Sequence, residues 1–203
     1  MKVADLDVVL LAGWTAPSHD LWLSRWTRQM RTARFIEQAD WETPQIDDWI
    51  ATIEAAVSEP TSSDTSDNEG IARKPLLFIA HSCGVTAFVR ALPRLPRDRI
   101  AGAFLVAPPD LATSDIWPAT HGGFREMPLD PLNIPAIVIA SSNDPYCDLA
   151  RARTFAEAWG AAFKDVGAAG HINTASGHGP WPEGTLALAH FLKAQDGPSA
   201  QLN

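Results

Sequence analysis

The chain has 203 residues, 46% of them hydrophobic, and a formal net charge of −8 with a pI near 5.1. The length and composition suit a single globular domain over residues 1–203, while the acidic balance argues against nucleic acids and anionic membranes as partners. No apolar run is long enough for a signal peptide or a membrane span, and the two cysteines form neither a metal motif nor a disulfide framework, so we expect a cytoplasmic protein.

The first part of the chain alternates strand-like and helix-like segments. An almost wholly apolar run, 7–12, predicts a strand that is covered on both faces and ends at Gly13-Trp14. Ser18 is placed to cap the helix that follows. The expected elements are, in order, a strand over 7–12, a helix over 21–30, a more polar strand over 33–38 near an edge of the sheet, and a helix over 46–57.

The segment 58–70 differs in kind from its surroundings. It is acidic, rich in Ser and Thr, and holds no apolar residue that could anchor it. Such a composition cannot bury enough apolar surface to offset the entropy of ordering the chain. We therefore expect a mobile acidic surface loop, and a frayed tail over 195–203.

The centre of the chain holds an apolar run that ends abruptly in Ala80-His81-Ser82-Cys83-Gly84, and a helix-like segment follows. This is the layout of a nucleophile elbow, in which a serine lies on a strained turn between a strand and a helix. The turn needs small residues two before and two after the serine, here Ala80 and Gly84, because bulky side chains would clash. Were Cys83 the nucleophile, Val85 would occupy the second of these positions, so Ser82 is the candidate.

The second half of the chain continues the same alternation and predicts an α/β fold. Its expected elements are strands over 100–107, 136–140 and 162–166, helices over 85–92, 149–159 and 184–193, and a loop or short helix over 111–131. Alternating strands and helices predict a doubly wound, mostly parallel six-stranded sheet in the order 2-1-3-4-5-6. Ligands bind such sheets outside the carboxyl ends of the strands at the switch point, where Gly13-Trp14 and Ser82 leave the first and third strands.

A serine hydroxyl needs a base to take its proton as it attacks, and the base needs an acid to orient it. In this fold the chain order is serine, acid, histidine. Asp144 directly follows the strand at 136–140, and His171 lies in the loop after the strand at 162–166. The predicted catalytic residues are therefore Ser82, Asp144 and His171.

Other acids and histidines fit these roles less well. Asp110 follows the fourth strand and is an alternative acid, whereas Asp148 stands where a helix N-cap is needed. His178 shares the loop of His171 but lies further from the strand end, and the side chain of His81 is expected to point away from the site. The remaining histidines are expected to be exposed or packed: His19, His121 and His190.

Acyl transfer also needs N–H donors aimed at the developing oxyanion. We expect these to be the backbone N–H groups of Cys83, at the start of a helix, and Trp14, after the first strand. The aromatic side chains that could rim a small substrate pocket, or equally belong to the core, are Trp14, Trp117, Tyr146 and Trp181. The topology places Cys83 and Cys147 near the site, so sensitivity to oxidation is a further hypothesis.

With these residues placed, nearly the whole chain resembles the small serine hydrolase family that includes retinoblastoma-binding protein 9. The matching motifs are Gly13-Trp14, Trp41-x-x-Pro44 with Trp49, His81-Ser82-x-Gly84, Ser142-Asn143-Asp144-Pro145, Gly170-His171-Ile172-Asn173 and Ser176-Gly177-x-Gly179-x-Trp181-Pro182-x-Gly184. The departures are Ala80 at the first elbow glycine, Cys83 after the serine, and the acidic loop. The resemblance implies a compact α/β-hydrolase without a large lid that uses Ser82, Asp144 and His171.

The function that these residues predict is a serine hydrolase acting on a small-molecule acyl ester through an acyl-enzyme intermediate. This chemistry needs no metal and no organic cofactor. Thioester or amide substrates, and a hydrolase-fold binding module with weak or no catalysis, are the alternatives, because fold alone does not establish activity. The sequence identifies no protein partner.

Overall fold

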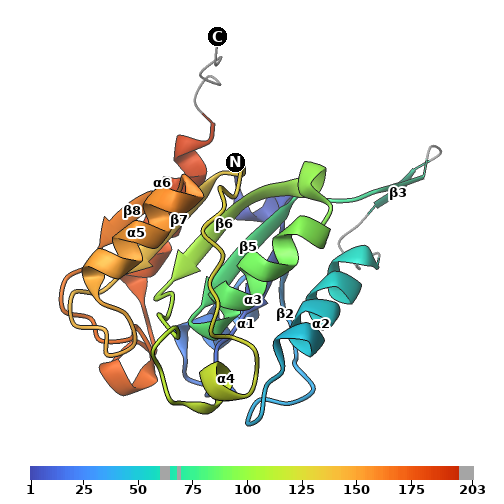
Figure 1. The fold of residues 1–203 in the computed structure, drawn as a ribbon. Helices are drawn as coiled ribbons and strands as arrows, with labels where there is room; N and C mark the ends of the chain where they lie inside the picture. The colour runs from blue at the N-terminus through green and yellow to red at the C-terminus, as the bar shows by residue number, and fades with distance from the viewer. Residues whose placement is uncertain (60–64, 68–69, 197–203) are drawn as a thin grey trace.

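A central parallel sheet of six strands carries the fold (Figure 1), and its order, β2-β1-β5-β6-β7-β8, confirms the predicted 2-1-3-4-5-6 arrangement. The computed structural model describes residues 1–59, 65–67 and 70–196. The strands of the sheet are β1 (Asp7–Leu11), β2 (Ala33–Phe35), β5 (Leu76–His81), β6 (Ile100–Val106), β7 (Ala136–Ala140) and β8 (Ala162–Asp165). The helices are α1 (Trp22–Gln29), α2 (Ile46–Ser58), α3 (Cys83–Ala91), α4 (Trp117–Thr120), α5 (Leu149–Trp159) and α6 (Pro182–Ala194). Single 3₁₀ turns lie at Val3–Asp5, Leu92–Arg94, Arg97–Arg99 and Thr174–Ser176.

Helices cover both faces of this sheet, so its strands are apolar on both sides (Figure 1). Successive strand residues point to opposite faces. In β1, Val9 packs in the core cluster formed with α2, α3 and α5, whereas Val8 and Leu10 pack in the cluster formed with α1 and α6. This is the doubly wound arrangement that the sequence predicts.

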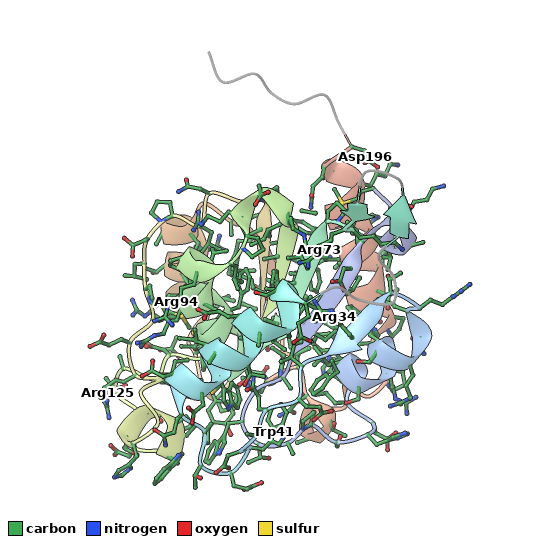
Figure 2. The ribbon with its side chains drawn as sticks, turned by 90° about the vertical axis from the view of Figure 1, so that its right-hand side faces the viewer. Arg34, Trp41, Arg73, Arg94, Arg125 and Asp196 are labelled. Atoms are coloured by element: carbon green, nitrogen blue, oxygen red, sulfur yellow. The ribbon has the colours of Figure 1, made fainter. Side chains whose placement is uncertain are left out.

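A buried ion pair joins the edge strand to the sheet. Asp7 at the start of β1 is 1% exposed, and it accepts hydrogen bonds of 2.9 and 3.0 Å from the guanidinium of Arg34 on β2. A third guanidinium N–H donates to the carbonyl oxygen of Ala56, so Arg34 also ties β2 to α2 (Figure 2). Because a buried carboxylate must be paired, this arginine lets the otherwise apolar β1 begin on an aspartate.

The boundary between β1 and β5 is the switch point of the sheet. The chain leaves β1 toward β2 on one side, while β5 continues to β6 on the other. Leu11 pairs with Ala80 at the last register position, so the segments starting at Gly13 and Ser82 emerge side by side. The fold therefore brings the predicted elbow to the edge where ligands bind such sheets.

Some local expectations were wrong. Ser18 does not cap α1: its backbone carbonyl accepts the N–H of Leu21, its hydroxyl lies 2.9 Å from that of Thr174, and the N-cap position belongs to Leu21. Asp148 does occupy the N-cap position of α5, but its side chain makes no capping hydrogen bond. For Ser18, the contact with Thr174 outcompetes the local capping signal.

Part of the expected loop over 58–70 is paired as a strand. Strands β3 (Thr65–Asp67) and β4 (Gly70–Ala72) pair antiparallel there. Residues 60–64 and 68–69 of the expected mobile loop, and 197–203 of the expected frayed tail, lie outside the described residues. Among the residues that are described, no helix combines the length and apolarity needed to cross a bilayer.

Candidate active site

Ser82 joins β5 to α3 in a backbone conformation that few side chains adopt. Its φ is 56° and its ψ −130°, a strained combination for a residue other than glycine. The N–H of Ser82 donates to the carbonyl oxygen of Val106 at 3.0 Å, and its own carbonyl accepts from Val85 at 2.8 Å. Hydrogen bonds on both sides thus hold the strained turn and place the serine between strand and helix, as in a nucleophile elbow.

Two glycines leave the space in which this turn fits. A Cβ on Gly84 would lie 2.6 Å from the carbonyl oxygens of both Leu11 and Ala12, so the start of α3 packs directly on the end of β1. A Cβ on Gly13 would lie 2.5 Å from the Cβ of Ser82. The small residue two positions after the serine, Gly84, is therefore needed because the end of β1 lies against it.

The three predicted catalytic side chains meet at this edge of the sheet. The hydroxyl of Ser82 lies 2.9 Å from Nε2 of His171, and Nδ1 of His171 lies 2.9 Å from both carboxylate oxygens of Asp144. The side chains of His171 and Asp144 are only 8% and 3% exposed. The carboxylate can therefore accept a hydrogen bond from Nδ1–H while Nε2 takes up the serine proton.

Two polar residues to which the sequence assigned no role connect the loop of the acid to the loop of the histidine. The side-chain oxygen of Asn143 accepts the N–H of Gly170 at 2.7 Å, and the hydroxyl of Ser141 accepts the N–H of Ala169 at 2.9 Å. Ser141 also donates to Asn143 at 2.9 Å. The position of Asn143 next to the candidate acid was the available signal, but the partner loop is visible only in three dimensions.

The alternative acid and histidines have other partners. Asp110 forms an ion pair with Arg151 at 3.0 Å. His178 is half-buried beside Ser176, 3.2 Å from its hydroxyl. His81 is 4% exposed and donates from Nε2 to the carbonyl oxygen of His171 at 2.9 Å, so it lies behind the base rather than in front of it. Of the other histidines, His121 stacks on Trp117, and His19 and His190 are exposed.

The residues expected to bind an oxyanion adjoin the serine. Cys83 is the first residue of α3, so its N–H is free of helical partners at the positive end of the helix. The backbone at Gly13 passes close by, since a Cβ there would lie 3.1 Å from the nitrogen of Cys83. The indole of Trp14 is held by a 3.0 Å hydrogen bond to the carbonyl oxygen of Glu42.

Both thiols are buried and protonated. Burial raises the pKa of Cys83 to about 11, although the backbone N–H of Trp14 and the Ser82 hydroxyl partly offset it. Burial also raises the pKa of Cys147 to about 12, with the nearby carboxylates of Asp110 and Asp144 adding to the effect. Thiolates are the reactive form of cysteine, so the expected sensitivity to oxidation finds no support here.

A small cavity of about 70 Å³, lined by both polar and apolar side chains, opens on the serine. It is lined by Trp14, Ser82, Cys83, Pro109, Leu111, Ile116, Tyr146, His171 and Asn173. Trp14 and Tyr146 are therefore placed as the sequence analysis suggested, and Tyr146 lies edge-on to His171 with ring centres 4.6 Å apart. Trp117 lines none of this cavity, and Trp181 is 4% exposed, packed in the core against Trp22 and Trp26.

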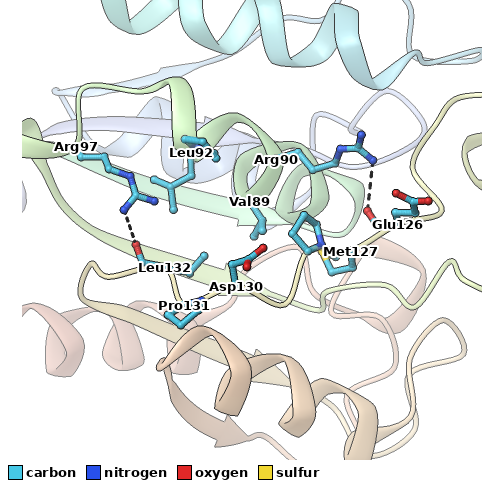
Figure 3. A pocket seen from close by; sticks show the side chains of 11 residues that line it. Val89, Arg90, Leu92, Arg97, Glu126, Met127, Asp130, Pro131 and Leu132 are labelled. Carbon is cyan, nitrogen blue, oxygen red and sulfur yellow. Dashed lines mark hydrogen bonds between the residues drawn. The ribbon is translucent and has the colours of Figure 1, made fainter.

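A second cavity, of about 180 Å³, lies on the other side of Trp14 and His171, between the segments 12–18 and 173–175. A third and larger one, of about 450 Å³, lies far from the serine, between the end of α3 and the segment 126–132 (Figure 3). There Arg90 and Arg97 donate to the carbonyl oxygens of Gly123 and Leu132 at 3.0 and 3.1 Å. These arginines fix the segment that walls the cavity, which contains none of the three site residues.

No group of three or more His, Cys, Asp or Glu side chains among the described residues is placed to hold a metal ion. The site consists instead of a hydroxyl, an imidazole and a carboxylate in hydrogen-bonded sequence. Such a set can transfer a proton away from the hydroxyl as it attacks an electrophilic carbon.

Comparison with known proteins identifies relatives of the whole chain. The model of the family described as serine hydrolase matches residues 8–190. A protein of Pectobacterium atrosepticum described as a YdeN-like hydrolase is 31% identical, with a TM-score of 0.76, over 94% of this chain and 92% of its own. The YdeN protein of Bacillus subtilis is 20% identical, with a TM-score of 0.73, over 93% of this chain and 99% of its own. Est1E of Butyrivibrio proteoclasticus, solved with ferulic acid, is 14% identical, with a TM-score of 0.68, over 93% of this chain and 88% of its own. No curated protein matches the chain.

Proposed function

The chain belongs to the serine hydrolase family, and from this membership we propose that it cleaves short-chain acyl esters through an acyl-enzyme on Ser82. The observation that carries the proposal is the continuous hydrogen-bonded sequence from the Ser82 hydroxyl through His171 to Asp144, with each step 2.9 Å long. The narrower resemblance to retinoblastoma-binding protein 9 stays a prediction.

In the proposed reaction, the Ser82 oxygen attacks the acyl carbon while Nε2 of His171 takes its proton. The N–H groups of Cys83 and Trp14 stabilise the oxyanion, and His171 returns the proton to the departing alcohol. Water, activated by the same imidazole, then cleaves the acyl-Ser82 bond to release the acid. Asp144 holds His171 in the tautomer that accepts at Nε2 and stabilises its positive charge.

The cavities support short, uncharged substrates. The cavity at the serine has room for a short acyl group, at about 70 Å³, and Leu111 and Ile116 supply an apolar part of its wall. No lysine or arginine is among the described residues lining this cavity or its 180 Å³ neighbour, and Arg151, which lines an adjoining 300 Å³ cavity, is paired with Asp110. An anionic leaving group would lack a counter-charge there, so we infer a neutral alcohol as the departing group.

Hydrolysis of p-nitrophenyl esters from acetate to octanoate by wild type and Ser82→Ala tests this function. We expect the highest kcat/KM on the shortest chains and a loss of turnover of at least about 10³-fold in the variant. Turnover of amides or thioesters but not of esters would change the substrate class while keeping the nucleophile. If folded wild type hydrolyses none of these, the hydrolase-fold binding module becomes the better account.

A further inference from the structure

His81 directly precedes the candidate nucleophile, but its side chain lies on the inner side of the site. As the last residue of β5 it is 4% exposed, and its Nε2 lies 2.9 Å from the carbonyl oxygen of His171. A carbonyl oxygen only accepts hydrogen bonds, so Nε2 of His81 carries the proton. The end of β5 is thus followed directly by Ser82, and its last side chain, His81, binds the backbone of His171.

A second buried donor lies beside the first. Nε1 of Trp22, a fully buried side chain on α1, donates to the carbonyl oxygen of Ile172 at 2.9 Å. Ile172 has a φ of 48°, a strained value for a β-branched residue, and is fully buried. The rings of Trp22 and His81 meet edge to face, 5.9 Å apart. Two adjoining ring N–H groups therefore hold two consecutive carbonyls in a strained stretch of backbone.

Burial keeps His81 in the state that this contact requires. Desolvation, and next the nearby imidazole of His171, lower the pKa of His81 to about 3. His178 adds a smaller effect in the same direction. His81 therefore stays neutral at physiological pH, does not compete for the serine proton, and adds no positive charge beside His171 when that ring is protonated.

We propose that His81 is a positioning residue. Its hydrogen bond to the backbone of His171 fixes how close Nε2 of that imidazole lies to the Ser82 hydroxyl. The proposal rests on the proposed hydrolase function. Asn143 and Ser141 hold the same loop from the side of the acid, so the imidazole of His171 is fixed from both directions. If the His81 contact is removed, the loop keeps only its hydrogen bonds to Asn143 and Ser141 and the Trp22 hydrogen bond at Ile172. We expect Nε2 of His171 to move away from the serine oxygen as a result.

Three substitutions separate the hydrogen bond from the packing. In His81→Gln the amide nitrogen stands near the former Nε2 and can donate to the same carbonyl. In His81→Asn it stands near the former Nδ1, too far back to do so. His81→Phe keeps the ring and removes the donor. A fourth variant, Trp22→Phe, lies on α1. It removes the neighbouring N–H donor and keeps an aromatic ring in the core.

Two readouts are measured on variants whose circular dichroism matches wild type. The first is kcat and KM on p-nitrophenyl acetate. The second is the low-field proton NMR signal of the His171 Nδ1–H, which does not depend on turnover. We expect His81→Gln to keep kcat within about threefold, and His81→Asn and His81→Phe to lose at least about tenfold with KM within about twofold. The signal survives in the Gln variant and is lost to exchange with water in the other two, and Trp22→Phe weakens it.

Each outcome decides the matter. Wild-type kcat and an intact signal in His81→Phe would overturn the proposal, as would equal losses in the Gln and Phe variants, because a restored donor would then not restore the position of the base. If wild type hydrolyses no ester, the proposed function fails on its own, while the proton signal still shows whether His81 holds His171. If His81→Phe does not fold, the comparison of Gln with Asn and the Trp22→Phe signal decide.

Discussion

Gly13 and Ser82 approach each other so closely that a methyl group on the glycine would overlap the serine. A Cβ on Gly13 would lie 2.5 Å from the Cβ of Ser82 and 2.8 Å from its hydroxyl oxygen. The two residues are 69 positions apart in the chain and meet because β1 and β5 are neighbours at the switch point. The space around Ser82, which follows β5, is thus limited by Gly13, which follows the neighbouring strand β1.

Gly13→Ala is therefore expected to displace the Ser82 hydroxyl from His171. We predict a fall in kcat on p-nitrophenyl acetate of at least about tenfold, since displacements of about 1 Å cost reaction rates this much or more. Gly160→Ala is the matched control: its φ of 67° strains the alanine by about 1 kcal/mol, but no atom lies within 4 Å of its Cβ and it lies far from the site. Equal kcat values in the two variants would contradict the prediction.

Asp144 and Asp110 can be separated as candidate acids by the same substitution. Asp144→Asn is expected to lower kcat by about 10²-fold to 10⁴-fold, because the amide favours the wrong tautomer of His171. Asp110→Asn breaks only a partly exposed pair with Arg151 and is expected to change kcat by less than about threefold. The reverse ranking in a steady-state assay would move the acid to Asp110.

The depressed pKa of His81 makes the protein less stable in acid. The folded-state pKa is about 3 against an ordinary value of 6.5, so the unfolded chain binds the extra proton between these values. The stability is fully present above pH 6.5 and is lost as the pH falls toward 3, by up to about 1.4 kcal/mol per pH unit.

Urea unfolding at pH 7, 6 and 5 measures this effect. Carboxylates elsewhere affect wild type and His81→Gln alike, so the difference between their unfolding free energies isolates His81. We predict that wild type loses more stability than the variant as the pH falls. A difference that stays constant from pH 7 to pH 5 would show that His81 titrates at its ordinary pKa, and a relative gain of wild-type stability would show that the folded protein holds the proton on His81.

Cys83 and Cys147 are expected to be unreactive while the protein is folded. With pKa values of about 11 and about 12, the thiolate fraction at pH 8 is on the order of 0.1% or less. Reaction with Ellman's reagent should be slow in buffer, and two thiols should react at once in guanidinium chloride. Rapid reaction of the folded protein, or loss of esterase activity in peroxide, would indicate a redox-sensitive site instead.

The parts of this structure that follow from local pattern were predictable. Apolar runs marked the central strands of the main sheet, the more polar segment 33–38 was expected near an edge, and the alternation of strands with helices predicted the strand order. Ser82, Asp144 and His171 could be placed because each lies just beyond a strand, and parallel strands end at the same edge.

Features that depend on distant partners were not predictable. Ser18 has a capping side chain but is drawn to Thr174, and Trp181 is buried against aromatic residues of α1 rather than placed in a pocket. The contact of Asn143 with Gly170 crosses two loops. Local sequence pattern does not show which residues pair with one another in such contacts.

The most direct test of the account is reaction of the intact protein with a fluorophosphonate, followed by mass spectrometry of the whole chain and its peptides. An activated serine displaces fluoride and forms one covalent bond to phosphorus. We predict a single adduct, mapped to Ser82, that is absent from Ser82→Ala and retained in Ser142→Ala, where the lost hydroxyl belongs to an exposed residue in the loop of the acid. An unlabelled wild type that is correctly folded, or an adduct on any other residue, would contradict the assignment of Ser82 as the nucleophile.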